Sequence, residues 1–190
     1  MNYNKTFKSL AGQLLVAMPQ MNDPRFSHSV IYVCGHDEQS AMGIVINKTI
    51  DSFYFKDLAE QLNIKMDGML PQIPIHFGGP VDMARGFVIH STDYDHSSSI
   101  LLSDYLALTA SLDVLECIAK DEGPSHKIIA LGYAGWSALQ LDREIQENSW
   151  LVVEPDPTLI YETNADDLWH KALKKLGVDP QFLSTVAGHA

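Results

Sequence analysis

The amino-acid sequence predicts a fold of the α+β class. Short apolar runs with strand spacing gather in the first half of the chain, at residues 12–18, 29–34 and 42–47. Amphipathic helical segments follow at irregular intervals and do not alternate regularly with strands as in repeating βαβ units. The 190 residues are 46% apolar and 19% charged, which suits one buried core, so we expect a single domain over residues 1–190.

The first third of the chain predicts a strand, a capped turn and a hairpin. After the strand at residues 12–18, Asp23 is expected to cap a short turn that Pro24 begins, because proline suits a first helical position. The runs at residues 29–34 and 42–47 are separated by a short polar segment, which predicts an antiparallel hairpin.

A helix and two further strands come next. Asp51 or Ser52 is expected to cap a helix whose apolar residues recur at helical spacing, namely Phe55, Leu58, Ala59 and Leu62. Residues 73–77 and 86–90 then have strand character. The glycine- and proline-containing connection between them fits either a bulged hairpin or a wider crossover.

The second half contains weaker strands and clear helices. Residues 100–108 are extended, and Ser111 is expected to cap a helix that Gly123-Pro124 stops. Residues 150–153 and 159–161 are predicted to be short strands.

The last predicted helix covers residues 165–176. Asn164 is its expected cap and Gly177 its expected end, with acids in the first turn and lysines late, as the helix dipole favours. Its inward stripe is predicted to be Trp169, Ala172, Leu173 and Leu176.

Residues 127–148 are predicted to be the central element, reading as strand, tight turn and helix. The apolar run 128–131 suits a strand covered on both faces, and Gly132 and Gly135 bracket a turn where positive φ is expected. Ser137 and Gln140, three residues apart, form a capping-box pattern. With Ser137 as the cap, the helix is predicted to begin at Ala138.

This predicted turn is the candidate ligand- or partner-binding site. Tyr133 and Trp136 would form an aromatic wall beside Gly132 and Gly135, and Gln140 and Glu144 would face it from the helix. Packing of the two aromatic rings over the core is the simpler interpretation of the same residues.

Catalytic interpretations of this turn find little support. A nucleophile elbow needs a serine between the glycines, where the chain has Tyr133 and Ala134. An anion site at the helix start would lie close to acidic Asp142 and Glu144. Cys34 with His36 as a base is a further alternative, although a buried thiol beside an exposed histidine is commoner.

Metals and cofactors are not predicted. His76, His90 and His96 would bind a metal only if folding gathered them, and no HExxH-type spacing is present. The two cysteines, far apart and without metal spacing, suit a reduced, cytoplasmic protein. No segment approaches the roughly twenty apolar residues of a membrane span.

The charge distribution favours a protein partner over nucleic acid. The net charge is −11, and residues 104–170 hold 13 acids against three bases, a net of −10. Nucleic-acid binding normally needs a basic patch, and the densest basic group here is Lys171, Lys174 and Lys175. A partner of the acidic half would be a basic protein surface or a cation, and a solvated acidic face is the simpler alternative.

Motifs along nearly the whole chain resemble those of the YqgE/AlgH family. They are residues 12–19 (GQLLVAMP), Asp23-Pro24-x-Phe26, 41–48 (AMGIVINK), 78–81 (GGPV), 85–90 (RGFVIH), 131–136 (LGYAGW) and 187–190 (AGHA). The resemblance implies a bacterial α+β protein with a mixed, bifurcated β-sheet, partly curled into a small barrel and surrounded by helices. The chain departs from the family pattern at Thr49, where proline is usual, and at Leu139, where glycine usually precedes Gln140.

The resemblance implies little chemistry. The family carries the label of transcriptional regulator by association, without a recognised DNA-reading element. Asp23, Asn47 and Arg85 are polar residues within the family-like motifs and join the candidate site, although capping, turn formation and an internal ion pair also explain them.

Three functions follow from these observations. The preferred hypothesis is a non-enzymatic regulatory or interaction protein that acts through protein contacts. A small-molecule binding protein or unrecognised enzyme at the Gly132–Trp136 turn is the alternative, and direct DNA binding is disfavoured by the charge. The sequence leaves the oligomeric state open and is compatible with a monomer.

Overall fold

The computed structural model describes residues 7–66, 68 and 71–179. In this part of the chain the strands are β1 (Leu14–Ala17), β2 (Val30–His36), β3 (Ser40–Val45), β4 (Thr49–Tyr54), β5 (Pro74–Phe77), β6 (Val81–His90), β7 (Ile100–Ser103), β8 (Leu106–Thr109), β9 (Lys127–Ser137) and β10 (Trp150–Val153). The helices are α1 (Phe55–Gln61), α2 (Leu112–Ala119), α3 (Gln140–Gln146), α4 (Pro157–Tyr161) and α5 (Ala165–Lys175). The predicted α+β class is confirmed, and the AGHA motif lies outside the described residues.

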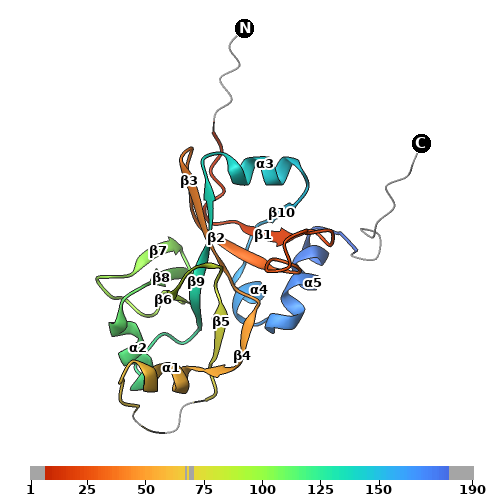
Figure 1. Ribbon diagram of the computed structural model, residues 1–190. Helices are drawn as coiled ribbons and strands as arrows, with labels where there is room; N and C mark the ends of the chain where they lie inside the picture. The colour runs from red at the N-terminus through yellow and green to blue at the C-terminus, as the bar shows by residue number, and fades with distance from the viewer. Residues whose placement is uncertain (1–6, 67, 69–70, 180–190) are drawn as a thin grey trace, which may run out of the picture.

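The strands form one bifurcated sheet in which β9 belongs to both branches. The main path runs β10-β1-β2-β3-β9-β6-β8-β7, and every neighbouring pair along it is antiparallel. The second branch is β4 paired with β5, which runs parallel to the N-terminal half of β9. The main path curls into a half-barrel with helices around it (Figure 1), which confirms the mixed, bifurcated sheet implied by the family resemblance.

The largest core fills the inside of this curl. It combines apolar residues of β1, β2 and β3 with those of β6, β8 and β9, and α4 and α5 close it. Trp169 on α5 is buried here, and its indole N–H donates to the carbonyl oxygen of Ala17 on β1 (2.8 Å). The C-terminal helices are therefore anchored to the first strand.

Two smaller cores lie on the outer faces of the same strands. The core beneath α3 contains Leu141 and Trp150 against β1, β2, β3 and the end of β9. The core beneath α1 and α2 contains Phe55 and Ile118 against β5, β6 and β9. Because both faces of the central strands are covered, their apolar runs are nearly continuous, as the run at residues 128–131 predicts.

The sheet branches where three glycines bring backbones into direct contact. Gly78 follows β5, accepts a hydrogen bond from the amide of Val45 (2.8 Å) and donates one to the carbonyl of Leu131 (2.8 Å). It thus fills the gap where β3 and β9 diverge. A Cβ added to Gly79 would lie 2.1 Å from the carbonyl carbon of Tyr133, and one added to Gly132 would lie 2.4 Å from the Gly79 oxygen. Only glycine fits this contact.

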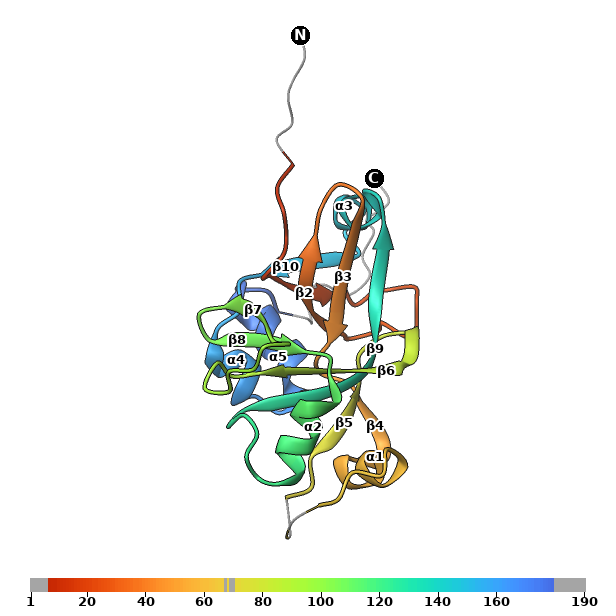
Figure 2. The ribbon, with the colours of Figure 1, turned by 90° about the vertical axis from the view of Figure 1, so that its left-hand side faces the viewer.

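The predicted tight turn at residues 132–135 is wrong. Gly132 has the expected positive φ of 72°, but it bends β9 instead of reversing it. The strand continues to Ser137 because Met42 and Ala41 of β3 pair with Gly135 and Trp136. Figure 2 shows β9 as one long strand leading towards α3.

Helix starts were predicted less well than helix positions. The α1 helix is not capped by Asp51 or Ser52, which lie in β4. Tyr54 occupies the N-cap, and its amide donates to the Asp57 carboxylate (2.8 Å). The α3 helix begins at Gln140, two residues later than predicted.

The C-terminal predictions were correct for β10 and for α5 but wrong for residues 159–161. This segment belongs to α4, because Pro157 occupies the first turn and the Asp156 carboxylate caps it by accepting from the Leu159 amide (2.8 Å). On α5, Leu168 is buried although it was not predicted to face inward. Leu176 was predicted to face inward but is 41% exposed.

The connection between β5 and β6 is the wider crossover. Both strands pair with β9, on opposite edges, and β6 begins at Val81, earlier than predicted. The extended stretch at residues 100–108 is a hairpin of β7 and β8. No helix of the described residues is long and apolar enough to cross a bilayer.

Replacing Gly132 with alanine should destabilise the fold by about 3 kcal/mol or more, because a Cβ collides with backbone at the branch point. Gly177→Ala is the matched control, since Gly177 has φ of 71° and open space around its Cβ position. The control should lose about 1 kcal/mol from the backbone conformation alone. Urea unfolding of both variants measures the difference, and equal losses would contradict the close-packed branch point.

Candidate functional site

A cavity of about 520 Å³ lies beside the end of β9. Three segments line it: the loop at residues 20–26, the start of β6 with the preceding Pro80, and the stretch from Gly135 to Trp150 that includes α3. We refer to it as the α3 cavity. Of the predicted site residues, it brings together Asp23, Gly135, Trp136, Gln140 and Glu144.

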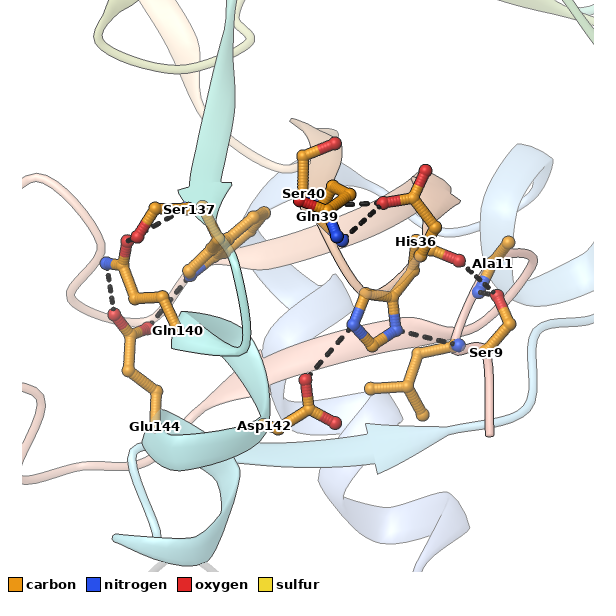
Figure 3. Close-up of polar contacts among 12 residues, drawn as sticks. Ser9, Ala11, His36, Gln39, Ser40, Ser137, Gln140, Asp142 and Glu144 are labelled. Carbon is orange, nitrogen blue, oxygen red and sulfur yellow. Dashed lines mark hydrogen bonds and ion pairs between the residues drawn. The ribbon is translucent and has the colours of Figure 1, made fainter. Parts of the chain in front are cut away.

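Glu144 is the centre of the polar contacts in this cavity. Its Oε2 accepts hydrogen bonds from the indole N–H groups of Trp136 (2.9 Å) and Trp150 (2.8 Å). Its Oε1 accepts from the side-chain Nε2 of Gln140 (2.8 Å), and Figure 3 shows this link on the helix. One carboxylate therefore satisfies two indoles from separate strands and fixes α3 against β9 and β10.

The two indole rings themselves are buried. Trp136 is 6% exposed and Trp150 is 2% exposed, and their rings meet edge to face at 6.1 Å. Phe26 packs against Trp150 at 5.8 Å from the loop on the opposite side. The predicted aromatic wall is thus partly a core contact, and the polar groups face the cavity beside it.

The start of α3 uses the predicted capping residues in a different way. The amide and hydroxyl of Ser137 both donate to Oε1 of Gln140 (3.0 and 3.1 Å). Leu139 sits at the N-cap with a left-handed φ of 55° and is 52% exposed. Glycine would adopt this backbone conformation without the steric cost that a leucine side chain carries.

Asp23 and Asn47 hold loops in place. Asp23 caps the predicted turn by accepting from the Arg25 amide (3.0 Å), and the Arg25 guanidinium pairs with the same carboxylate (2.7 Å). This contact lowers the pKa of Asp23. Asn47 accepts from the Val30 amide (2.7 Å) and donates to the His28 carbonyl (2.9 Å), so it fixes β2 to the end of β3.

Tyr133 and Arg85 lie away from the α3 cavity, around Phe87 of β6. Tyr133 is half-buried and meets Phe87 edge to face at 6.0 Å. Arg85 is exposed on β6 and lies over the same Phe87 ring at 5.2 Å. Both line a second cavity of about 560 Å³, which shares Val81, Gly135 and Trp136 with the α3 cavity. Gly132 lines neither cavity, since it lies buried at the branch point.

Cys34 and His36 do not form a nucleophile and base. Burial raises the pKa of the Cys34 thiol to about 12. His36 was predicted to be exposed, but its side chain is buried, with only 2% exposed. Its Nδ1 accepts from the Leu10 amide (3.0 Å), and its Nε2 donates to Asp142 (3.3 Å). This histidine ties the N-terminal segment to α3.

The histidines considered as metal ligands are not gathered. His90 is buried with its Nε2 2.8 Å from the Thr109 hydroxyl, and His96 stacks on Tyr94. Burial lowers the pKa of His76 on β5. Among the described residues, no group of three or more His, Cys, Asp or Glu side chains is placed to hold a metal ion.

Of the three partners of Glu144, Trp136 and Gln140 were among the predicted site residues, and Trp150 was missed. Trp150 starts β10, which reaches the sheet only through β1, so the sequence contains no signal that links it to Glu144. Arg25 and Phe26 also line the cavity and were not predicted as site residues. Their place in the Asp23-Pro24-x-Phe26 motif, next to the predicted Asp23, was the sequence signal that could have identified them.

These features define an α+β protein with a branched sheet and two adjacent cavities beside its shared strand. The chain belongs to the AlgH-like family (DUF179), whose model matches residues 14–181. It is 48% identical over 181 residues to a UPF0301 protein of Rhodospirillum rubrum, covering 95% of this chain and 94% of the relative. A UPF0301 protein of Bartonella tribocorum is 42% identical over 188 residues, with 95% and 96% covered.

Solved structures agree with the fold. The solution structure of the AlgH protein from Pseudomonas aeruginosa has a TM-score of 0.76 and 38% identity, with both chains covered completely. The crystal structure of protein DIP2367 from Corynebacterium diphtheriae has a TM-score of 0.73 over 98% of this chain and 95% of that one. At 22% identity, this second likeness concerns the fold alone.

Leu139→Gly should stabilise the protein by about 0.5–1 kcal/mol. The change removes the cost of a left-handed leucine, offset in part by greater freedom of the unfolded chain. Little packing is lost because the side chain is about half exposed. Thermal unfolding measures the effect, and a lower Tm in the glycine variant would contradict it.

Glu144→Ala should cost about 2–4 kcal/mol, because two indole N–H groups would lose their acceptor in a largely buried setting. Glu147→Ala is the matched control, because Glu147 is exposed at the C-cap of the same helix, and we expect a change within about 0.5 kcal/mol. Urea unfolding compares them. Similar stabilities of both variants would show that the carboxylate does not fix α3.

Proposed function

We propose that this protein is a non-enzymatic, cytoplasmic regulatory protein that acts by binding another protein. The observation that carries the proposal is an exposed apolar surface around the edge strand β7. Ile100 and Leu101 on this strand are 62% and 68% exposed. Leu112 at the start of α2 is 57% exposed. We call Ile100, Leu101 and Leu112 the β7 surface.

The edge of the sheet supports this proposal. β7 pairs with β8 and ends the main path of the sheet, so its outer backbone groups are not paired with another described strand. Edge strands are templates for an added strand from another chain. In Figure 1, β7 lies on the side of the molecule opposite α4 and α5, and Figure 2 brings it to the front.

Hollows next to the β7 surface would hold side chains of such a segment. The second cavity is lined by Ile100 and Phe87 together with Arg85. A smaller apolar hollow of about 100 Å³ lies beside Leu112, between α1 and α2. Exposed apolar residues around hollows of this kind are typical of protein-binding surfaces.

Acidic residues around the β7 surface indicate the charge of the partner. Asp95, Asp104 and Asp113 are exposed in the segments that flank β7 and begin α2. Asp93 in the same loop accepts hydrogen bonds from Ser91 and Ser125, which lower its pKa to about 2, so it stays ionised. A segment that combines apolar side chains with Lys or Arg would be complementary, whereas duplex DNA would be repelled.

Site-specific photocrosslinking in living cells tests the proposal. A photoreactive amino acid at Leu101 or Leu112 should give adducts with the same protein, whereas one at Leu176, which is 41% exposed at the end of α5, should not. The purified partner should bind the wild type at least about tenfold more tightly than the double variant Ile100→Ser with Leu101→Ser, because burial of two apolar side chains is lost.

A substitution away from the β7 surface provides the control. Leu176→Ser should leave binding unchanged, and all variants should keep the wild-type Tm because the substituted side chains are exposed. Adducts that are absent, or equally frequent at all three positions, would contradict a protein-docking role for the β7 surface. Binding of duplex DNA at low ionic strength that weakens with salt would also contradict it.

A further inference from the structure

The α3 cavity has a chemistry that the proposed protein-docking role does not use. Arg25 is the basic residue in its wall, and its guanidinium is already paired with Asp23. Two further carboxylates, those of Glu144 and Glu147, line the cavity without a cationic partner among the described residues. The wall therefore has a local charge of about −2.

The Glu144 carboxylate has no cationic partner among the described residues and retains some acceptor capacity. Its three hydrogen-bond donors, two indoles and one carboxamide, are neutral, so none of them compensates the carboxylate charge. A carboxylate oxygen accepts about two hydrogen bonds, and Oε1 accepts one here. One acceptor position on Glu144 is therefore left for a ligand.

Other polar side chains beside Glu144 are also available to a ligand. Glu147 lies three residues after Glu144, a spacing that places two side chains on one helix face. In the described part of the chain, the side-chain amides of Gln20, Asn22 and Asn148 form no hydrogen bond with other residues. Carboxamides both donate and accept, so the excess of acceptors in this cavity comes from the carboxylates of Glu144 and Glu147, which favour a ligand that donates.

Apolar groups complete the wall. Phe26 and Met21 are half-buried on the loop side of the cavity, opposite α3. Their carbon atoms suit a short aliphatic chain, and aromatic rings also attract organic cations. A volume of about 520 Å³ accommodates a small metabolite.

We propose that the α3 cavity binds a small aliphatic diamine or a related organic cation. One ammonium group donates to the free acceptor position of Glu144, and the second lies near Glu147. The methylene chain between them packs beside Phe26. The site is separate from the β7 surface, so the two proposals fail independently.

The three tryptophans provide a site-specific readout. In ¹H–¹⁵N spectra, the indole signals of Trp136 and Trp150 report on Glu144, whereas Trp169 lies in the other core and serves as an internal control. Titration with 1,4-diaminobutane at constant ionic strength should shift the first two signals saturably and leave the third unchanged. The neutral 1,4-butanediol should shift none of them.

Variants separate a built site from general charge attraction. Glu147→Gln should weaken diamine binding by about fivefold, the effect of one partly solvated charge pair. Glu162→Gln makes the same charge change on an exposed residue after α4, away from the cavity, and should leave affinity unchanged. Equal weakening by both, or no saturable shift, would overturn the proposal.

The same NMR titration distinguishes a free diamine from a lysine side chain of a partner protein. Nα-acetyl-lysine methylamide offers one ammonium group, as a lysine of a partner protein would. Because two carboxylates face the cavity, the diamine should bind more tightly than this compound. The reverse order would assign the cavity to a lysine side chain and overturn the free-diamine proposal.

Discussion

The close contact between Gly78, Gly79 and Gly132 is the constraint on which the rest of this structure depends. Backbone from the end of β5 fills the gap where β3 and β9 diverge, and any Cβ at these positions would meet backbone atoms. The contact lets one strand, β9, serve both branches of the sheet. It also places the start of β6 beside Tyr133, and from there the two cavities open on either side of β9.

From this branch point, the two proposed sites differ in chemistry because β9 alternates its side chains. Trp136 points into the core beneath α3, where Glu144 holds it, and Tyr133 points to the face that β6, β7 and β8 share. The first face offers carboxylates and amides to a small cation, and the second offers apolar residues to a polypeptide. A single strand therefore separates the proposed ligand cavity from the proposed docking surface.

The sequence predicted the elements better than their junctions. Most strands and helices could be located from apolar periodicity, because the spacing of apolar residues along a short segment reflects which of its faces is buried. The path of residues 132–136 could not be predicted, since Gly132 bends a strand only in the presence of Gly79, more than fifty residues away. For the same reason Glu144 was recognised as a candidate, whereas its contact with Trp150 depends on pairing between β1 and β10.

Native-state hydrogen exchange tests the central claim most directly. The amides of Val45 and Gly78 donate across the branch point, so the account predicts that both exchange only through global unfolding, with protection equal to that of the buried strands β1 and β2. Exchange of these two amides by local opening, while β1 and β2 stay protected, would contradict a branch point that holds the sheet together.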